Sequence, residues 1–252
     1  YQHTYLLLKR YFMLSYINKI ALCISIFCLS SLANASLITN GSFEETTFSD
    51  GSTSNGAVFG TNLQSFETKR RAWDVYYNLP GWITSFGNGI ELQKNVVTSS
   101  QDGSHHVELD SHPSGASNAV MTQTLKSLII GSDYLLEFYY KPRTNGTNDN
   151  GINVFWYDSA VNFNLDMKTV LVADSTRQNT PNWIKKSVSF TAKTQSMNLS
   201  FASFGKQNTL GGLIDNVSLE QIKVPEPPMA LLFFTAISIL FINRYKKNNS
   251  TS

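Results

Sequence analysis

The sequence predicts an all-β domain, a β-sandwich of jelly-roll type, with a targeting segment at each end. Short runs of β-branched and aromatic residues recur along the chain, and apolar and polar positions alternate clearly in two of them, at Val188/Phe190 and Leu199/Phe201. Turn-forming residues separate the runs, and no convincing amphipathic helix occurs between Ser36 and Val224. Many short strands at this spacing are typical of a sandwich. The expected strands are Ile90–Gln93, His106–Asp110, Ala119–Leu125, Tyr134–Tyr140, Ile152–Tyr157, Thr169–Val172, Ser187–Thr191, Met197–Phe201 and Leu213–Leu219.

The predicted domain organisation has three parts. Residues 1–35 hold upstream residues and a signal peptide, residues 36–223 form the sandwich, and residues 224–252 form a sorting tail. The central part is of ordinary size for one all-β domain, and it shows no internal repeat. Its polar stretch Phe48–Thr68 is expected to be the longest loop.

The N-terminal part has the pattern of a secretory signal peptide. Lys19 precedes a short apolar run, and Ala33-Asn34-Ala35 follows as a small-x-small cleavage site, with the cut expected after Ala35. Met13 gives a signal peptide of normal length. The alternative, a permanent anchor, is disfavoured because the apolar run is short and a cleavage site follows it.

The C-terminal part combines three features in order. A Pro225-Glu226-Pro227 motif is followed by the uncharged run Met229–Ile242 and then by a basic end with Arg244, Lys246 and Lys247. The run is shorter than the roughly 20 residues that a spanning helix prefers. A thin span held by these cations on the cytoplasmic side is expected.

This ordered combination resembles the PEP-CTERM sorting signal of exported bacterial proteins. The resemblance covers about the last 25 residues. It implies recognition by an exosortase-type membrane protease and transient anchoring by the C-terminal helix. Release to the cell surface or to an exopolysaccharide matrix would follow. It implies nothing about the activity of the domain upstream.

Removing the two ends changes the composition of what remains. Both cysteines, Cys23 and Cys28, lie in the signal peptide, so the mature domain has no disulfide. The ends carry six Lys or Arg residues and one Glu, so the formal net charge falls from +2 for the whole chain to about −3 for the domain. The basic balance therefore belongs to targeting, and nucleic acid is not an expected partner.

Five motifs in order resemble the galactose-binding-like jelly rolls of carbohydrate-binding modules. They are Leu37–Glu44, Leu79–Trp82, Ile90–Leu92, Asp102–Asp110 and Gly212–Leu219. The resemblance spans nearly the whole mature domain and implies the fold, whereas a shared fold does not define a ligand. It further implies a structural calcium site that includes Glu44, after the first strand, and Asp215, in the last. Carboxylates with loop carbonyls are the hard oxygen ligands that calcium prefers. The alternative is a solvated Glu44 and an Asp215 that belongs to a turn.

Two segments have the composition of a glycan-binding site, in which aromatic rings stack on sugars and polar groups bind hydroxyls. The first contains Trp73, Tyr76 and Tyr77. The second contains Arg143 and Asn148 in a loop ahead of Trp156. The alternative for each aromatic residue is structural packing, which we expect for Trp82 and Trp183.

Catalytic interpretations have little support. Asp110, Ser111 and His112 are adjacent, but a Ser/His/Asp triad is defined by geometry, and the G-x-S-x-G elbow is missing. The adjacent His105 and His106 would point to opposite faces of a strand, which disfavours a zinc site. Glu91, Glu108 and Asp110 could supply a carboxylate pair for glycoside hydrolysis, although strand residues bounding loops are the simpler interpretation.

The sequence thus predicts an exported, noncatalytic surface or matrix-associated protein that binds extracellular polysaccharide. The first alternative is a structural matrix protein without a specific glycan ligand, and a glycan-acting hydrolase is the second.

Overall fold

The computed structural model describes residues 35–49, 57–113 and 117–223. Its contacts divide the chain into two compact units, Tyr1–Leu37 and Ile38–Ser252. Ala35, the last residue of the predicted signal peptide, is described and exposed. The predictions for Ala33 and for the sorting motif Pro225, Glu226 and Pro227 lie outside the described residues. Within the described ranges, no helix is long and apolar enough to cross a membrane.

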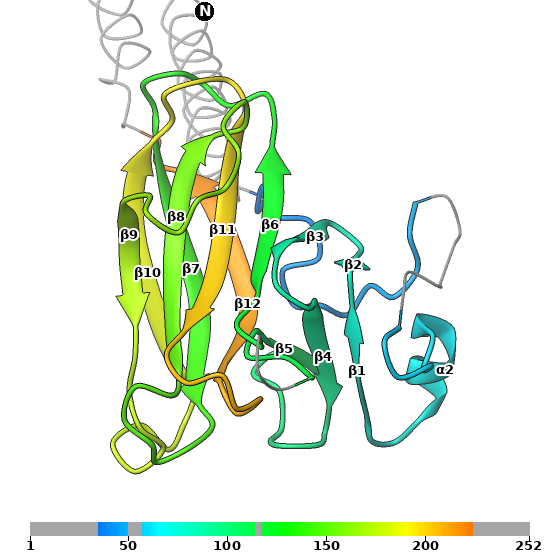
Figure 1. The fold of residues 1–252 in the computed structure, drawn as a ribbon. Coiled ribbons are helices and arrows are strands. Elements are labelled where there is room, and N and C mark those ends of the chain that lie inside the picture. The colour runs from blue at the N-terminus through cyan, green and yellow to red at the C-terminus, as the bar shows by residue number, and fades with distance from the viewer. Residues whose placement is uncertain (1–34, 50–56, 114–116, 224–252) are drawn as a thin grey trace, which may run out of the picture. The chain divides into compact units, whose positions relative to one another are not determined.

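Twelve strands and one short helix are described in the second unit (Figure 1). Their bounds are α2 Leu63–Thr68, β1 Ala72–Tyr76, β2 Asn78–Leu79, β3 Trp82–Phe86, β4 Ile90–Lys94, β5 His105–Glu108, β6 Val120–Leu125, β7 Asp133–Pro142, β8 Gly151–Asp158, β9 Thr169–Ala173, β10 Ile184–Thr191, β11 Met197–Phe204 and β12 Gly212–Gln221.

The strands form two six-stranded antiparallel sheets that pack as a sandwich. Sheet A has the order β1-β4-β5-β12-β7-β10, and sheet B has the order β2-β3-β6-β11-β8-β9. Neighbours in each sheet are mostly distant in sequence, and the chain crosses repeatedly from one sheet to the other (Figure 1). The predicted all-β, jelly-roll-type sandwich is confirmed.

The core lies between the two sheets and follows from the alternation along each strand. In β7, Tyr134, Leu136, Phe138 and Tyr140 are buried, whereas the residues between them are partly exposed. Phe138 meets Phe201 of β11 edge-on, with ring centres 5.1 Å apart. Trp82 is 1% exposed, which confirms its predicted place in the core.

The expected long loop contains a helix that the sequence analysis did not predict. Asn62 caps α2 by accepting a hydrogen bond from the Ser65 N–H at 2.7 Å, and Leu63 and Phe66 bury one side of it. A helix of six residues is too short to show a helical period, which is why this stretch resembled a loop.

The motif at the start of the domain does not form the expected first strand. Asn40 and Phe43 have positive φ angles of 52° and 60°, which interrupt an extended chain. The segment still lies beside the last strand, because the Val217 N–H donates to the Gly41 carbonyl at 2.9 Å. Glu44 therefore follows an irregular segment, not a strand.

Candidate functional site

The side of sheet A that faces away from the core, here called the outer face, carries two rows of side chains. Directly opposed residues of antiparallel strands share a face. Trp73, Gln93 and His106 are opposed in one row across β1, β4 and β5. Val75, Glu91 and Glu108 form the next row across the same strands. The alternate residues of β4 and β5, such as Leu92 and Val107, belong to the core.

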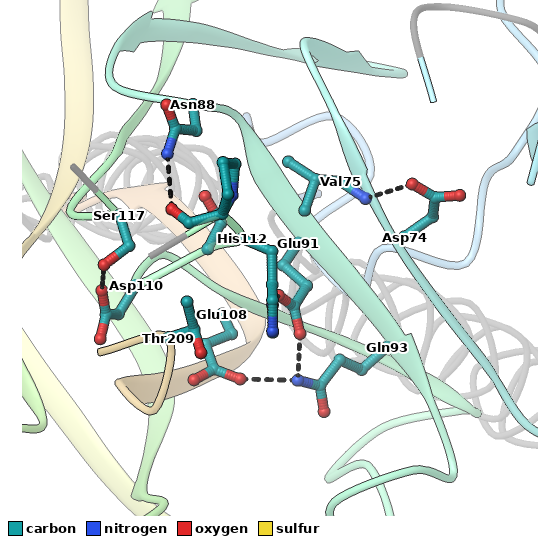
Figure 2. Close-up of polar contacts among 12 residues, drawn as sticks. Asp74, Val75, Asn88, Glu91, Gln93, Glu108, Asp110, His112, Ser117 and Thr209 are labelled. Atoms are coloured by element: carbon teal, nitrogen blue, oxygen red, sulfur yellow. Dashed lines mark hydrogen bonds and ion pairs between the residues drawn. The ribbon is translucent and has the colours of Figure 1, made fainter. Parts of the chain in front are cut away.

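The buried members of these rows form one hydrogen-bonded network. The Gln93 amide nitrogen donates to Glu91 Oε1 at 2.8 Å and to Glu108 Oε2 at 2.6 Å (Figure 2). Because carboxylates accept hydrogen bonds, the amide oxygen of Gln93 faces the other way and lies 3.2 Å from His106 Nε2. His106 Nδ1 lies 2.9 Å from the Ser100 hydroxyl. Because the Gln93 amide oxygen can only accept, His106 Nε2 is its donor, and in the neutral imidazole Nδ1 then accepts from the Ser100 hydroxyl.

Glu108 joins this network to two loops. Its carboxylate accepts from Arg143 Nη1 at 2.6 Å and from the Gly211 N–H at 2.5 Å, and Arg143 Nη1 also donates to the Thr209 carbonyl at 2.9 Å. The side chain of Glu108 is completely buried. Burial raises the pKa of Glu108, the neighbouring Glu91 raises it further, and Arg143 opposes both.

A partly exposed layer of aromatic and cationic side chains covers the two ends of the network. At one end, the rings of Trp73 and His112 have centres 4.7 Å apart, and His112 Nδ1 lies 2.9 Å from Glu91 Oε2. At the other end, the Trp183 ring meets His106 at 5.7 Å, and Lys141 Nζ lies 6.0 Å from the Trp183 ring centre. Trp183 Nε1 donates to the Ser99 carbonyl at 2.9 Å, which orients the indole.

The structure brings together some of the predicted glycan-contacting residues. Trp73 and Arg143 belong to the same network, connected through His112, Glu91, Gln93 and Glu108. Both have accessible surface, and the Arg143 side chain is 20% exposed.

The other predicted residues lie elsewhere. Tyr76 is completely buried, with its hydroxyl donating to the Thr61 carbonyl at 2.6 Å, so it leaves the set of candidate contact residues. Trp156, on β8 of sheet B, is partly exposed, packs against the core and stacks on Phe190 with ring centres 4.4 Å apart, so it does not belong to the outer face of sheet A. Tyr77 is 55% exposed beyond the end of β1, and Asn148 is exposed on the loop between β7 and β8.

Several residues of the outer face were missed or were assigned another role from the sequence. Gln93, His106 and Lys141 were not proposed as binding residues, and Trp183 was expected in the core, although it is partly exposed on this face. Glu91 and Glu108 were considered only as a hydrolytic pair. Their signal was present in the alternation Ile90-Glu91-Leu92-Gln93, in which both outward positions are polar groups able to bind each other.

Glu44 and Asp215 meet at one loop, as predicted, but by hydrogen bonds. Glu44 Oε1 accepts from the N–H groups of Ser104 and His105, and Asp215 Oδ2 accepts from those of Gln101 and Asp102. Their remaining oxygens accept from the Ser104 hydroxyl and the Asn216 N–H. Burial raises the pKa of Asp215 to about 7, against the effect of these hydrogen bonds.

In this geometry each of the four carboxylate oxygens accepts a hydrogen bond from the protein. Calcium binding by Glu44 and Asp215 stays a prediction from the resemblance. If calcium binds here, it ties the two carboxylates together, and a chelator is expected to lower the melting temperature by several degrees. An unchanged melting curve with and without the chelator would contradict calcium binding.

The residues considered above for zinc binding and for a Ser/His/Asp triad are engaged in contacts with other parts of the domain. His105 contacts the Phe66 ring on the other side of the strand from His106, which confirms that the two histidines point to opposite faces. The Ser111 hydroxyl donates to the Gly89 carbonyl, and the adjacent His112 binds Glu91 instead of Ser111. Among the described residues, no three His, Cys, Asp or Glu side chains are grouped to hold a metal ion.

Several solved structures can be aligned with this chain over most of its length. A Stig cyclase from Fischerella sp. TAU, in complex with an indole compound, is 15% identical, with 76% of this chain and 100% of that chain covered and a TM-score of 0.47. TmCBM61, in complex with β-1,4-galactotriose, is 13% identical over 75% and 99% of the two chains, with a TM-score of 0.42. The CBM22-1 xylan-binding domain of Xyn10C from Paenibacillus barcinonensis is 12% identical over 77% and 99%, with a TM-score of 0.43. Identities this low say nothing about what this chain binds.

A sequence comparison identifies the family. No curated protein matches the chain. One family model, described as a protein of unknown function (DUF642), matches residues 36–220. This match covers most of the chain and almost all of the sandwich. The chain therefore belongs to the DUF642 family.

Proposed function

We propose that this protein binds extracellular polysaccharide, without catalysis, through the outer face of sheet A. The observation that carries the proposal is the two-layered arrangement on that face. Partly exposed Trp73 and Trp183 lie at the two ends of a buried polar network that fixes their neighbours. A polysaccharide is recognised by aromatic rings that stack on sugars and by polar groups held in one orientation.

The buried layer supports binding because it holds the contact residues in place. Glu108 and the Thr209 carbonyl fix the guanidinium of Arg143, and Glu91 fixes the imidazole of His112. Side chains that are already fixed lose little conformational entropy when a ligand arrives. The outer face therefore presents a prepared surface of rings and hydrogen-bond donors.

The same contacts argue against glycoside hydrolysis by Glu91 and Glu108. A hydrolytic carboxylate pair must reach the glycosidic oxygen and the anomeric carbon of the sugar. Here Glu91 is 2% exposed and Glu108 is completely buried, and both accept hydrogen bonds from neighbouring side chains. Their role in the proposed function is to orient Gln93, His112 and Arg143.

The proposal includes export and sorting. The signal peptide would direct the protein across the inner membrane. The Pro225-Glu226-Pro227 tail would then anchor it briefly and present it to an exosortase-type protease before release to the cell surface or matrix. A domain with no cysteine outside the signal peptide suits this destination, because it needs no disulfide to fold.

Removing the Trp73 indole is expected to weaken glycan binding by about tenfold or more, because an aromatic ring that stacks on a sugar contributes a large share of the affinity. The measurement is affinity electrophoresis of the purified protein and its Trp73→Ala variant through a panel of neutral and acidic polysaccharides. Trp183→Ala tests the other end of the same surface. A circular dichroism melt of each variant separates lost binding from lost folding.

Phe86→Ala is the matched control, because Phe86 is a 53% exposed aromatic residue on sheet B, away from the outer face of sheet A. It is expected to migrate as the wild type does. If the folded wild-type protein shows no saturable retardation on any polysaccharide, the proposal fails, and a structural matrix protein becomes the better interpretation. Equal retardation of wild type, Trp73→Ala and Trp183→Ala would show that glycan binds elsewhere.

A further inference from the structure

A pocket lies where the outer face continues past the ends of β1 and β4. It has a volume of about 360 Å³ and is lined by Arg70, Arg71 and the segment 95–99. None of these lining residues carries an acidic side chain. The pocket is therefore a basic recess with polar and small apolar walls.

The strand register makes this pocket an extension of the outer face. Side chains two residues apart on a strand point to the same side. Arg71 lies directly before β1 and precedes Trp73 by two residues, and its Nε donates to the carbonyl of Asn95, directly after the end of β4. The row that contains the Trp73 ring thus leads directly into the pocket.

The wall of the pocket is also joined to the opposite end of the proposed binding surface. Thr98 accepts a hydrogen bond from Lys141 Nζ at 2.8 Å, and the Ser99 carbonyl accepts from Trp183 Nε1 at 2.9 Å. A chain lying over Trp73 or Trp183 would therefore pass beside the same segment. This places the pocket within reach of a sugar next to those that cover the rings.

The two arginines of the pocket have unused capacity for an anion. Among the residues that the structure describes, neither Arg70 nor Arg71 forms an ion pair. Arg71 Nε donates to the Asn95 carbonyl at 2.9 Å, which anchors the guanidinium and leaves its two terminal nitrogens to a ligand. A planar guanidinium presents paired N–H groups that match the two oxygens of a carboxylate.

We propose that this pocket binds the anionic group of an acidic polysaccharide, the carboxylate of a uronic acid residue, while neighbouring sugars lie on the outer face. This inference rests on the proposed function and specifies its substrate class. The contrast with the buried network supports it. Arg143 has its charge balanced by Glu108, whereas the charges of Arg70 and Arg71 have no balancing carboxylate among the described residues.

The test compares alginate, whose sugars carry carboxylates, with propylene glycol alginate, in which these are largely esterified. Affinity electrophoresis gives the dissociation constant of the protein for each polymer. The wild type is expected to bind alginate about tenfold more tightly or better, because esterification removes the charge-assisted hydrogen bonds between the carboxylate and the guanidinium groups. The Arg70→Gln, Arg71→Gln double variant is expected to lose most of this preference, and its loss on alginate should exceed its loss on the ester.

The control is the Lys126→Gln, Lys193→Gln double variant, which makes the same change in net charge at two exposed lysines. Lys193 follows the end of β10 that is remote from Trp183, and Lys126 follows β6, where the next residues meet the segment after Lys193 through the Leu128 N–H and the Gln195 carbonyl. This variant is expected to keep the wild-type preference. Dextran sulfate tests which anion the pocket prefers. If the double arginine variant loses affinity for both acidic polymers, the pocket is a general anion subsite. If it loses affinity for alginate alone, the pocket is a carboxylate subsite.

Two results would overturn the inference and leave the proposed function standing. One is a wild type that binds the ester as tightly as alginate, and the other is a double arginine variant that keeps the preference for alginate. A wild-type protein that is folded and binds no polysaccharide at all would overturn both proposals. The two failures are therefore distinguishable in one set of gels.

Discussion

Replacing Glu108 with alanine is expected to lower the free energy of unfolding by about 3–5 kcal/mol, because it removes one partner of a buried ion pair. Three donors would each lose a hydrogen bond to Glu108, namely Arg143, the Gln93 amide nitrogen and the Gly211 N–H. Arg143 keeps the Thr209 carbonyl as an acceptor, and the Gln93 amide keeps Glu91. The Arg143 side chain is only 20% exposed, so solvent replaces little of the lost interaction. Urea unfolding followed by tryptophan fluorescence gives the change.

Glu137→Ala is the matched control for this prediction. Glu137 lies in sheet A too and pairs with Lys185 at 2.6 Å, but the two side chains are 31% and 49% exposed. Exposed ion pairs contribute about 0–1 kcal/mol, so this variant should unfold at nearly the wild-type urea concentration. Equal changes for the two variants would show that the Glu108 network contributes no more than a surface pair.

The folded protein is expected to lose stability through His106 as the pH falls below about 6.5. Burial lowers the pKa of His106 to about 3, and the positive charges of His105, Lys141 and Arg143 add to this effect. Between these two pKa values the unfolded chain binds a proton that the folded chain does not. The stabilisation is therefore complete above pH 6.5 and declines by about 1.4 kcal/mol for each pH unit below it, until about pH 3.

The measurement is the free energy of unfolding of the wild type and of His106→Gln at several pH values between 7 and 4. Asp215 has the opposite effect in the wild type, because burial raises its pKa to about 7 and its stabilisation is lost as the pH rises towards that value. Both proteins contain Asp215, so its contribution cancels in their difference. The difference should shift in favour of His106→Gln as the pH falls, and a difference that is constant with pH would contradict a neutral, buried His106.

The fold was largely predictable because nine strands carry their own local pattern. In β7, for example, core and outward positions alternate without interruption from Tyr134 to Lys141. β1 was missed because its charged residue is on the core side of the sheet: Asp74 lies opposite the core residue Leu92, whereas Trp73 and Val75 lie on the outer face. Asp74 is completely buried there and accepts hydrogen bonds from the N–H groups of Phe59 and Thr61. The local sequence of a strand does not show which hydrogen-bond partners a distant loop will supply.

The outer face was less predictable, for a related reason. Trp73 and Arg143 could be proposed from composition, since an aromatic ring and a guanidinium in polar surroundings are typical of a binding site. Gln93 and His106 have no such signal individually, because their importance comes from the register that places β4 beside β5. Trp183 was assigned to the core for the same reason. Its sequence does not show that its ring lies against His106 on the outer face, where it is partly exposed.

The place of β12 in sheet A has a consequence for how the chain can be made. β12 is the last strand in sequence, yet it lies between β5 and β7 in the sheet. Until its residues have been synthesised, β5 and β7 have no common neighbour, and the amides of Gln101 and Asp102 lack their Asp215 acceptor. Strand pairing between such distant parts of the chain forms late and slowly. Sheet A can therefore be completed only after the final strand has emerged from the ribosome, and until then the two parts of the sheet that β12 joins cannot pair through it.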